Sequence, residues 1–485
     1  MPHDVLRLLR EAAIERLTSD SRRAARGAAF FAWPGAAADG RRYIAQAVAA
    51  GCGAVVWERE GFAWDERWRV PNAPVQDLKA KAGAIAHAFH GRASEAMWVC
   101  GVTGTNGKTT CTQWLAQVLS SRDTKTAVIG TLGSGFAPRF EPVDHTTPDA
   151  LELHGLLARF RTAGARAVAM EVSSHGLDQG RVNGVAFACA LLTNLTHDHL
   201  DYHGSMAAYA AAKARLFDAP GLQAAVLNLD DAFGVQLQRR LSARGLRTIG
   251  YGLDAQPAQA AEFLVAKSAG EERLEIRSAW GVAKIRFAQA GRFNVANALG
   301  VLGCLIAKGL PFDEAAARLE QLSPVPGRMQ RIGERPLVIV DYAHTPDALD
   351  KVLAALEPLA RARGGRLVAV FGAGGGRDAA KRPRMGLAAA QRADRLVLTS
   401  DNPRGEDPLA IIAAIRAGAA GGRAACAVEA DRARAIEAAI AEADARDVIL
   451  LAGKGHEQTQ EIAGRKLPFS DAAVAGAALA RRGGP

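Results

Sequence analysis

A strand, a glycine-rich turn and a helix follow one another directly in residues 97–119, and this stretch constrains the fold more than any other. The apolar run Met-Trp-Val-Cys predicts a buried strand, which glycines interrupt at Gly101, Gly104 and Gly107. Apolar residues at helical spacing then predict a helix that begins at Lys108. In such a turn main-chain N–H groups surround an anion, and the helix N-terminus adds roughly half a positive charge. The stretch therefore predicts a phosphate-binding loop in an α/β fold.

A triphosphate carries several negative charges, so the loop also needs a full cation and a metal ion. Lys108 suits the first task, and the Thr109 hydroxyl suits the second. The strict phosphate-loop spacing asks for its first glycine at position 102, where the chain has Val102, and Gly104 lies closer in. The alternative is a glycine turn that only joins a strand to a helix. Gly-Lys-Thr directly after a strand favours the phosphate loop.

Length and charge limit the partners that such a loop can serve. A chain of 485 residues is too long for one core and predicts two to four domains. The net charge of +10 is dispersed over Arg-rich helical patterns, which fits either a solvated face or an anionic nucleotide substrate. No stretch interleaves basic and aromatic residues, so we expect no nucleic-acid partner.

The cysteines and the N-terminus indicate a compartment. The cysteines are scattered without a C-x-x-C pair, as expected for small core residues in a reducing environment. The N-terminal stretch lacks an apolar signal core, and no run approaches the ~18 apolar residues of a membrane span. We therefore expect a cytoplasmic protein without a membrane partner.

Composition and strand patterns divide the chain into three units, 1–92, 93–326 and 327–485. The first is a small α/β layer. The other two repeat short apolar strands and helices, which predicts doubly wound, mainly parallel sheets with polar loops at the carboxyl ends of their strands. The Ala-rich stretches 411–420 and 432–446 have a helical pattern, and we interpret them as scaffold.

Several polar residues of the second unit follow apolar strands. Glu171 ends one strand and is either a magnesium ligand or a helix-capping acid. Residues 197–203, His-Asp-His-Leu-Asp-Tyr-His, suggest zinc, but the lack of paired cysteines and the adjacent phosphate loop favour magnesium. Lys213, taken alone, is typical of a solvated surface lysine on a helix.

Two turns carry groups that suit ligand binding. Thr146 and Thr147, in His-Thr-Thr-Pro-Asp, offer hydroxyl donors, although the same sequence is typical of a capped turn that opens a helix. Residues 401–404, Asp-Asn-Pro-Arg, present a carboxylate, an amide and a guanidinium together, which a plain surface turn explains equally well.

The sequence Thr-Gly-Thr-Asn-Gly-Lys-Thr-Thr at 103–110 resembles the ATP loop of the Mur ligases, the amide-forming enzymes that build the peptide of the bacterial cell wall. The resemblance extends over all three units, from Thr-Ser-Asp-Ser-Arg at 18–22 to Gly-Lys-Gly-His-Glu at 453–457. It implies a small α/β domain for the uridine nucleotide, a central P-loop domain and a Rossmann-like C-terminal domain. It also implies ATP as co-substrate and Mg²⁺ as cofactor.

The resemblance assigns residues to ATP and to the metal. In the family, the lysine of Y-x-x-A-K-x-x-L-F is carbamylated, so Lys213 is expected as N6-carboxylysine. Metal ligands are expected at Thr109, Glu171, His199 and carbamylated Lys213. Asn294 is expected to read adenine, whereas Asn297 caps or packs. The ATP-binding residues implied are Gly104, Thr105, Asn106, Gly107, Lys108, Thr109, Thr110, Asn294, Arg328, Asp341 and His344, with Lys381 at a further matching position.

A second set is implied for the UDP-linked dipeptide. Its residues are Ser21, beside Arg22, and Thr146, Thr147, Ser173, Gln179 and Arg181. Arg181 would supply charge for a carboxylate or phosphate. Ala36 and Ala37 stand where some relatives have polar residues near the uracil, which leaves side-chain contacts there in doubt.

The turn at 401–404 resembles the signature of those Mur ligases that add meso-diaminopimelate. This amino acid has a second ammonium and carboxylate pair at its far end, so its pocket must match both charges. Arg404 would pair with the distal carboxylate. The full set implied is Arg377, Asp401, Asn402, Pro403, Arg404, Gly453 and Glu457.

The resemblance to the Mur ligases implies an ATP-dependent ligase that joins meso-diaminopimelate to UDP-N-acetylmuramoyl-L-alanyl-D-glutamate through an acyl phosphate, and we expect it to be a monomer. Its catalytic residues would be Lys108, Glu171, His199 and Lys213, and closure of the third domain would expel water. One alternative is a sister ligase of the same fold that adds lysine, D-alanyl-D-alanine, or glutamate to a folate. The other is a P-loop module, such as a nucleic-acid-dependent ATPase, that hydrolyses ATP without an amino-acid substrate.

Overall fold

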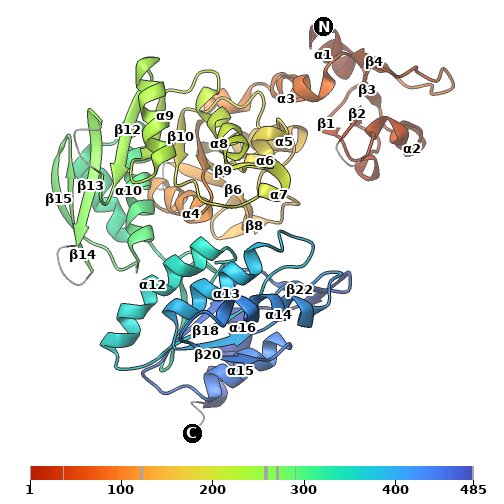
Figure 1. Ribbon diagram of the computed structural model, residues 1–485. Coiled ribbons are helices and arrows are strands. Elements are labelled where there is room, and N and C mark those ends of the chain that lie inside the picture. Colours follow the sequence, from red (N-terminus) through yellow and green to blue (C-terminus); the bar gives the residue numbers. More distant parts are fainter. Residues whose placement is uncertain are drawn as a thin grey trace.

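A computed structural model of the protein describes residues 2–35, 38–120, 124–255, 260–268, 272–289 and 291–482. The chain forms three helix-covered sheets in sequence order, and Figure 1 shows them as three groups of elements. Ala36 and Ala37, where uracil contacts are in doubt, lie outside the described residues. No helix in the described ranges is long and apolar enough to cross a membrane.

The first sheet is small and entirely parallel, as its apolar runs predict. Neighbouring residues alternate between its faces: Phe31 packs against the side of α1 (Pro2–Glu11) and α3 (Leu78–Phe89), and Phe30 against the side of α2 (Ile44–Ala49). Its strands, in spatial order, are β1 (Arg16–Thr18), β2 (Ala28–Ala32), β3 (Ala54–Glu58) and β4 (Asn72–Val75).

The second sheet has a parallel centre between two antiparallel edges, which confirms the predicted mainly parallel sheet. The strands of its centre, in spatial order, are β13 (Glu262–Ser268), β12 (Arg247–Gly252), β11 (Ala224–Asn228), β10 (Cys189–Leu192), β5 (Trp98–Thr103), β9 (Ala165–Glu171) and β6 (Lys125–Gly130). The edge strands are β15 (Gly281–Arg286) and β14 (Arg273–Ser278) beside β13, and β7 (Gly133–Phe136) and β8 (Arg139–Glu141) beside β6.

Helices cover both faces of this second sheet, so its strands are apolar on both sides. The helix predicted to begin at Lys108 is α4 (Lys108–Leu119), whose Trp114 and Leu115 are buried in the core of one face. That face also holds α10 (Arg292–Ala307) and α11 (Phe312–Arg318). The opposite face packs on α5 (Ala150–Thr162) and α9 (Ala232–Ala243). The short helices α6 (Ser174–Asp178), α7 (Leu200–His203) and α8 (Met206–Ala214) follow strand ends.

The third sheet repeats the doubly wound plan. Its strands, in spatial order, are β16 (Gln330–Glu334), β17 (Leu337–Asp341), β21 (Val448–Ala452), β18 (Leu367–Phe371), β19 (Arg395–Leu398) and β20 (Ala425–Val428), of which β16 is antiparallel. One face packs on α12 (Pro346–Ala362), α13 (Lys381–Arg392) and α14 (Pro408–Ala419), and the other on α15 (Arg432–Ala441) and α16 (Asp471–Arg482). The Ala-rich stretch 411–420 is therefore helical as predicted, and in 432–446 the helix ends at Ala441. A separate hairpin joins β22 (Thr459–Ile462) to β23 (Arg465–Pro468).

The second and third sheets turn their carboxyl ends toward each other. Arg328 of the third unit donates from Nη2 to Thr109 Oγ1 at 3.1 Å, in the first turn of α4. Asn106 of the loop after β5 donates from Nδ2 to Asp347 Oδ2 at 3.2 Å, in the first turn of α12. Ligands of open α/β sheets bind at this edge, so the two sheets form one site between them. The domain boundaries at 92 and 326 remain a proposal.

Candidate active site

The phosphate loop needs glycine at two of its positions. Gly104 and Gly107 adopt φ angles of +147° and +87°, in the range that favours glycine. A Cβ on Gly104 would lie 1.9 Å from Thr193 Oγ1, and one on Gly107 would lie 2.5 Å from Asn297 Oδ1. Close packing against β10 and α10 therefore fixes both glycines.

The segment after β10 holds this loop in place. Thr193 Oγ1 donates to the Asn106 carbonyl at 2.6 Å. The Thr105 amide donates to the Asn194 carbonyl at 2.9 Å, and the Asn106 amide to Asn194 Oδ1 at 3.0 Å. The loop is therefore anchored through its own polar atoms before any ligand is considered.

Two lysines converge on one carbonyl of the loop. Lys108 Nζ and Lys213 Nζ each donate to the Gly104 carbonyl at 2.8 Å. Burial lowers the pKa of Lys108, and burial together with the nearby Lys108 lowers the pKa of Lys213 well below its usual value. Lys213 is 1% exposed, so its interpretation as a solvated surface lysine is wrong. The helix α8 turns the face that carries Lys213 toward the protein interior. A single lysine in a helical pattern does not indicate this.

Glu171 ends β9 inside the protein. Its carboxylate accepts from the Thr131 amide at 2.8 Å and from Thr131 Oγ1 at 3.1 Å. The cap of the following helix is Ser173, whose Oγ accepts from the Gly176 amide, so the helix-capping interpretation of Glu171 is wrong. Glu171 keeps its carboxylate at the strand end, where a cation ligand is expected.

The histidine segment does not gather into a metal cage. Within the described ranges, the only group of at least three His, Cys, Asp or Glu side chains with mutually close ligand atoms is a cysteine group elsewhere. This gives no support to zinc at 197–203. His199 has a φ of 54°, and burial lowers its pKa to about 4, so its imidazole is neutral near pH 7.

Three residues of the third unit approach the phosphate loop. The Arg328 guanidinium, bonded to Thr109, also lies 4.2 Å from the centre of the Tyr342 ring. The buried Asp341 carboxylate accepts from the Met329 and Ala343 amides, each at 2.8 Å, and burial raises its pKa. Asp341 thus fixes the backbone that carries Arg328.

His344 is tied down close by, with its Nδ1 2.8 Å from the Tyr342 carbonyl. Because a carbonyl only accepts, Nδ1 is the donor in this bond. Burial lowers the pKa of His344, and the ring lines the same cavity as Arg328.

The residues expected at the dipeptide form a connected group. Thr147 Oγ1 donates to the Glu171 carbonyl at 2.9 Å and accepts from the Ser173 amide at 3.0 Å. Arg181 donates from Nη1 to the Thr147 carbonyl at 2.8 Å and from Nη2 to Gln179 Oε1 at 2.7 Å. Asp149, not Thr147, caps α5 with its side chain.

Thr146 and Ser21 lie differently from this group. The Thr146 and Thr131 hydroxyls share a hydrogen bond of 3.1 Å, which places Thr146 beside the partner of Glu171. Ser21 donates to Gln46 Oε1 at 3.1 Å within the first unit. Arg22 pairs with Asp20 at 2.8 Å.

A buried lysine that was not among the predicted residues connects side chains of the expected amino-acid site. Lys454 Nζ donates to Asn402 Oδ1 at 3.0 Å and to Glu457 Oε2 at 2.7 Å. Asn402 Nδ2 donates to Glu457 Oε2 at 2.9 Å, which closes the triangle. Lys454 is fully buried at the end of β21. A lysine directly after a buried apolar strand was the signal for it.

Arg404 has an unusual backbone conformation, and its side chain is held by the neighbouring loops. Its φ is 53°, and its Nη1 donates to the Gly375 carbonyl at 2.6 Å. Its Nε lies 3.5 Å from Glu461 Oε2. Gly453 lies so close to Asp401 that a Cβ there would be 2.4 Å from Asp401 Oδ2. Both strand ends therefore approach one another without an intervening side chain.

One cavity of about 960 Å³ lies between the second and third units. The predicted site residues that line it are Thr105, Asn106, Gly107, Lys108, Thr109, Thr110, Thr146, Thr147, Glu171, Ser173, Arg181, His199, Lys213, Asn294, Arg328, Asp341, His344, Arg377, Asp401, Asn402, Arg404, Gly453 and Glu457. Ser21, Gly104, Gln179 and Pro403 are not among its lining residues. The residues predicted to bind a nucleotide, a metal and a charged amino acid thus line one cavity.

Family models match the chain in three stretches. The Mur ligase family catalytic domain matches residues 13–90, the Mur ligase middle domain matches 102–305, and the glutamate ligase domain of the Mur ligases matches 327–455. Together these matches cover most of the chain.

Relatives with curated names match almost the whole chain. The chain is 49% identical over 472 residues to UDP-N-acetylmuramoyl-L-alanyl-D-glutamate--2,6-diaminopimelate ligase of Chromobacterium violaceum, covering 96% of this chain and 94% of the relative. It is 50% identical over 481 residues to the protein of that name from Ralstonia nicotianae, covering 96% and 93%.

Solved structures agree in fold. A structure of a ligase with the same name has a TM-score of 0.67 at 36% identity and covers 97% of this chain and 96% of its own. A MurF ligase from Thermotoga maritima in complex with ADP has a TM-score of 0.65 at 17% identity, covering 92% and 95%. The second likeness concerns the fold alone.

Proposed function

The chain belongs to the Mur ligase family, and on this basis we propose that it joins meso-diaminopimelate to UDP-N-acetylmuramoyl-L-alanyl-D-glutamate in an ATP-dependent reaction. The relatives at 49% and 50% identity that carry this ligase name support the substrates. One observation carries the proposal: the phosphate loop and the charged loops at 401–404 and 453–457 line a single cavity.

The chemistry follows from the poor reactivity of a carboxylate toward an amine. Transfer of the γ-phosphoryl group of ATP to the glutamyl carboxylate gives an acyl phosphate and ADP. The amine of diaminopimelate attacks the acyl carbon, the amine gives up a proton, and phosphate leaves as the amide forms. Lys108 would hold the phosphates, and catalysis would rest on positioning and on charge neutralisation.

We propose Mg²⁺ as the metal of this site. The donors suit a hard cation and its phosphate ligand: the buried Thr109 hydroxyl, the Glu171 carboxylate and the neutral His199 imidazole. When bound, Mg²⁺ would offset charge on the transferred phosphoryl group. Lys213 fits this set only as a carbamate, because an ammonium group has no lone pair to offer.

Carbamylation of Lys213 is a proposal that its surroundings support. Two ammonium groups on the Gly104 carbonyl would repel each other, which contributes to the lowered pKa of Lys213, and a carbamate there would be attracted to Lys108 instead. With ¹³C-labelled bicarbonate, we expect a carbamate carbon signal from the native protein. The signal should vanish in Lys213→Arg and persist in the matched surface variant Lys81→Arg. A plain amine at Lys213 in bicarbonate would overturn this assignment.

The decisive test of the function measures phosphate release with UDP-muramoyl-dipeptide and ATP. We expect turnover with diaminopimelate, much less with lysine, and none that depends on nucleic acid. Equal turnover with lysine would favour a sister ligase, and ATP hydrolysis without any amino acid would favour a P-loop ATPase. We further propose a cytoplasmic monomer, since both nucleotide substrates are cytoplasmic and the site is completed within one chain.

A further inference from the structure

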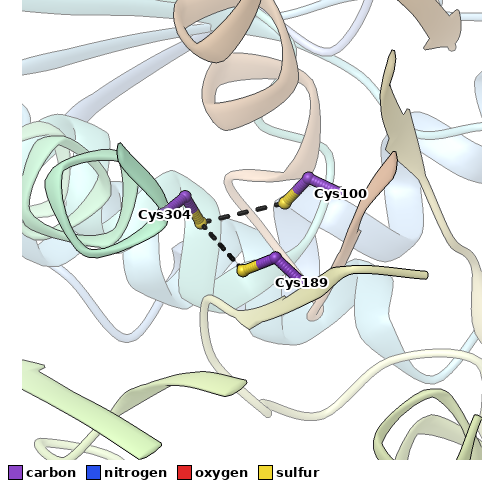
Figure 2. A group of neighbouring side chains, drawn as sticks. All are labelled: Cys100, Cys189 and Cys304. Carbon is purple, nitrogen blue, oxygen red and sulfur yellow. Dashed lines mark hydrogen bonds between the residues drawn. The ribbon is translucent and has the colours of Figure 1, made fainter. Parts of the chain in front are cut away.

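Three cysteines from separate parts of the chain meet behind the phosphate loop. Cys100 of β5 and Cys189 of β10 are paired across neighbouring parallel strands, and Cys304 of α10 packs over both. Cys304 Sγ lies 3.8 Å from Cys100 Sγ and 3.9 Å from Cys189 Sγ. Figure 2 shows the three sulfur atoms pointing toward one another. All three residues are fully buried.

The spacing of these sulfurs is that of ligands around one soft atom. Sulfurs bound at about 2.3 Å in tetrahedral directions lie about 3.8 Å apart, whereas a disulfide needs about 2.0 Å. The three ligand atoms all lie within 4.8 Å of one another. Cys111, also buried nearby on α4, is not part of the group. The site therefore offers three reduced thiols to one centre.

The apolar surroundings of the three cysteines favour a bound species that leaves the site without net charge. The cysteines belong to the apolar core between the second sheet and α10, with neighbours such as Val102 and Leu191. A divalent ion with three thiolates would leave a net negative charge there, and a buried unpaired charge is costly. A trivalent centre with three thiolates is neutral. Among thiophilic species, this favours arsenic(III), whose hydrated form is also uncharged near pH 7.

We propose that Cys100, Cys189 and Cys304 form a trithiol site that takes up arsenite and thereby inactivates the protein. In the reaction, As(OH)₃ and three thiols give As(S-Cys)₃ and three waters. Each arsenic–oxygen bond is replaced by an arsenic–sulfur bond, each thiol proton leaves in water, and arsenic stays trivalent. No oxidant or reductant is needed.

Inactivation follows from where the cross-link lies. Cys100 is three residues before the end of β5, which leads into the phosphate loop, and Cys189 begins β10, which leads to Thr193 and Asn194. These two residues anchor the loop at Thr105 and Asn106. The sulfurs already lie at the separation of bound ligands, so the perturbation comes from the added arsenic atom, which over-packs the core between β5, β10 and α10. We expect the strand ends to shift and ATP binding to weaken. This step does not depend on which amino acid the enzyme adds.

The test incubates the full-length protein with arsenite and a phosphine reductant. We expect one arsenic per chain in native mass spectra, three sulfur neighbours by X-ray absorption at the arsenic edge, and loss of ATP binding that a competing dithiol reverses. Cys304→Ala should keep its ATP affinity in arsenite. The matched core variant Cys111→Ala should remain sensitive.

Several results would overturn the site. These are no arsenic uptake by the native protein, two sulfur neighbours in place of three, or equal uptake and sensitivity in Cys304→Ala. If Cys304→Ala does not fold, Cys189→Ala provides the same comparison, because it also removes one of the three thiols.

The helix α15, which the Ala-rich pattern predicts to be scaffold, also carries a buried ion pair. Arg432 begins α15 and Asp471 begins α16, and both side chains are fully buried. Arg432 donates from Nε and Nη2 to the two Asp471 carboxylate oxygens at 2.7 and 2.6 Å. The same guanidinium donates to the Ser400 carbonyl at 3.3 Å and to the Ala452 carbonyl at 2.9 Å.

These two carbonyls directly precede the loops expected to bind the amino acid. Ser400 is followed by Asp401, and Ala452 by Gly453. One rigid guanidinium thus ties the ends of β19 and β21 together from below the site. We infer that Arg432 is a positioning residue for diaminopimelate, an inference that rests on the proposed function.

The test compares two ways of removing this bond. Arg432→Lys keeps the charge but cannot reach both carbonyls and the carboxylate, and Arg432→Met with Asp471→Leu removes the pair without leaving an unpaired charge. We expect the KM for diaminopimelate to rise about ten- to a hundredfold in both, as for a misplaced charged hydrogen bond, with the KM for ATP little changed. Where the double variant does not fold, Arg432→Lys is decisive.

Arg366 provides the matched control. It pairs with Asp447 at 2.9 Å before β18 and β21, at the opposite edge of the same sheet. Arg366→Met should lower stability without changing the KM for diaminopimelate. An unchanged KM in Arg432→Lys would overturn the positioning role, whereas absence of turnover with diaminopimelate in the native protein would overturn the proposed function instead.

Discussion

Arg404 is a residue whose backbone angle and partners matter as much as its charge. Its positive φ of 53° directs the side chain back across the turn to the Gly375 carbonyl and Glu461. Both partners are acceptors that a carboxylate substrate could replace or share through the five guanidinium N–H groups. Arg404 therefore already lies in a geometry suited to a distal carboxylate.

We predict that Arg404→Ala raises the KM for diaminopimelate by about 30-fold to several thousandfold. The reason is the loss of one partner of a desolvated charge pair, which costs about 2–5 kcal/mol. Phosphate release at varied diaminopimelate measures it, with the exposed Arg416→Ala as control. Native-like use of diaminopimelate by Arg404→Ala would contradict the assignment.

Single residues also mark the limit of prediction from sequence. Lys108 was predictable because its neighbours define a loop, and the loop dictates what the lysine faces. Lys213 is isolated in sequence, and only the packing of α8 reveals that it is buried, whereas the position of Lys454 just after an apolar strand was a signal of its burial. The burial of Arg432 could not be predicted either, because its partner Asp471 lies far along the chain.

At the level of elements, strand ends were the most predictable feature. The strands β5, β9 and β21 each lead into a polar loop. In the sequence, each is visible as an apolar run that stops at a glycine or a charged residue. The order of strands in the sheets was not visible, because parallel pairing joins segments far apart in sequence. The contact between α10 and the phosphate loop was hidden for the same reason.

The phosphate loop itself gives a prediction. Gly104→Ala should abolish measurable ATP binding, because its Cβ would clash with Thr193 Oγ1 at 1.9 Å in addition to the strained φ. Gly221 also has a positive φ, of +76°, but has open space around it, so Gly221→Ala introduces backbone strain without a clash. Calorimetric titration with ATP separates the two, and equal ATP affinity in both variants would contradict the role of close packing.

The helix α5 carries a pH-dependent contact. His154 is 1% exposed, its Nε2 lies 2.9 Å from the Asn183 carbonyl, and burial lowers its pKa to about 4. Below its ordinary pKa of about 6.5, the unfolded chain takes up a proton that the folded protein rejects. The stabilisation by neutral His154 is therefore complete above about pH 6.5 and decreases toward pH 4, by about 3 kcal/mol at most.

We predict that the melting temperature drops more between about pH 7.5 and about pH 5 in the native protein than in His154→Gln. Glutamine keeps a donor for Asn183 and does not titrate in this range. Thermal unfolding of both proteins at the two pH values provides the measurement. Parallel decreases would assign the pH effect to other groups.

At the scale of the whole molecule, the main feature is the interface between the second and third units. Asp347 of α12 accepts from Asn106 Nδ2 and from Thr196 Oγ1, each at 3.2 Å. Both donors lie on loops at the carboxyl edge of the second sheet. In Figure 1 the third group of elements, which contains α12, lies beneath that edge.

We predict that Asp347→Ala weakens the contact between the second and third units. Loss of two hydrogen bonds should raise the KM for ATP about two- to tenfold and enlarge the radius of gyration in solution. X-ray scattering and steady-state kinetics measure the two effects. Glu437→Ala, which removes a pair with Arg481 inside the third unit, should change neither. A native radius and a native KM in Asp347→Ala would contradict the prediction.

The shared cavity has a consequence for inhibitor design. Thr109 and Arg404 line the same cavity, but Thr109 belongs to the second unit and Arg404 to the third. A compound long enough to contact both residues would bind the second and third units at once. Part of its binding free energy would therefore be used to fix the two units relative to one another. Such a compound should make both units melt in a single cooperative transition, whereas fragments that occupy one end should protect only the unit they touch.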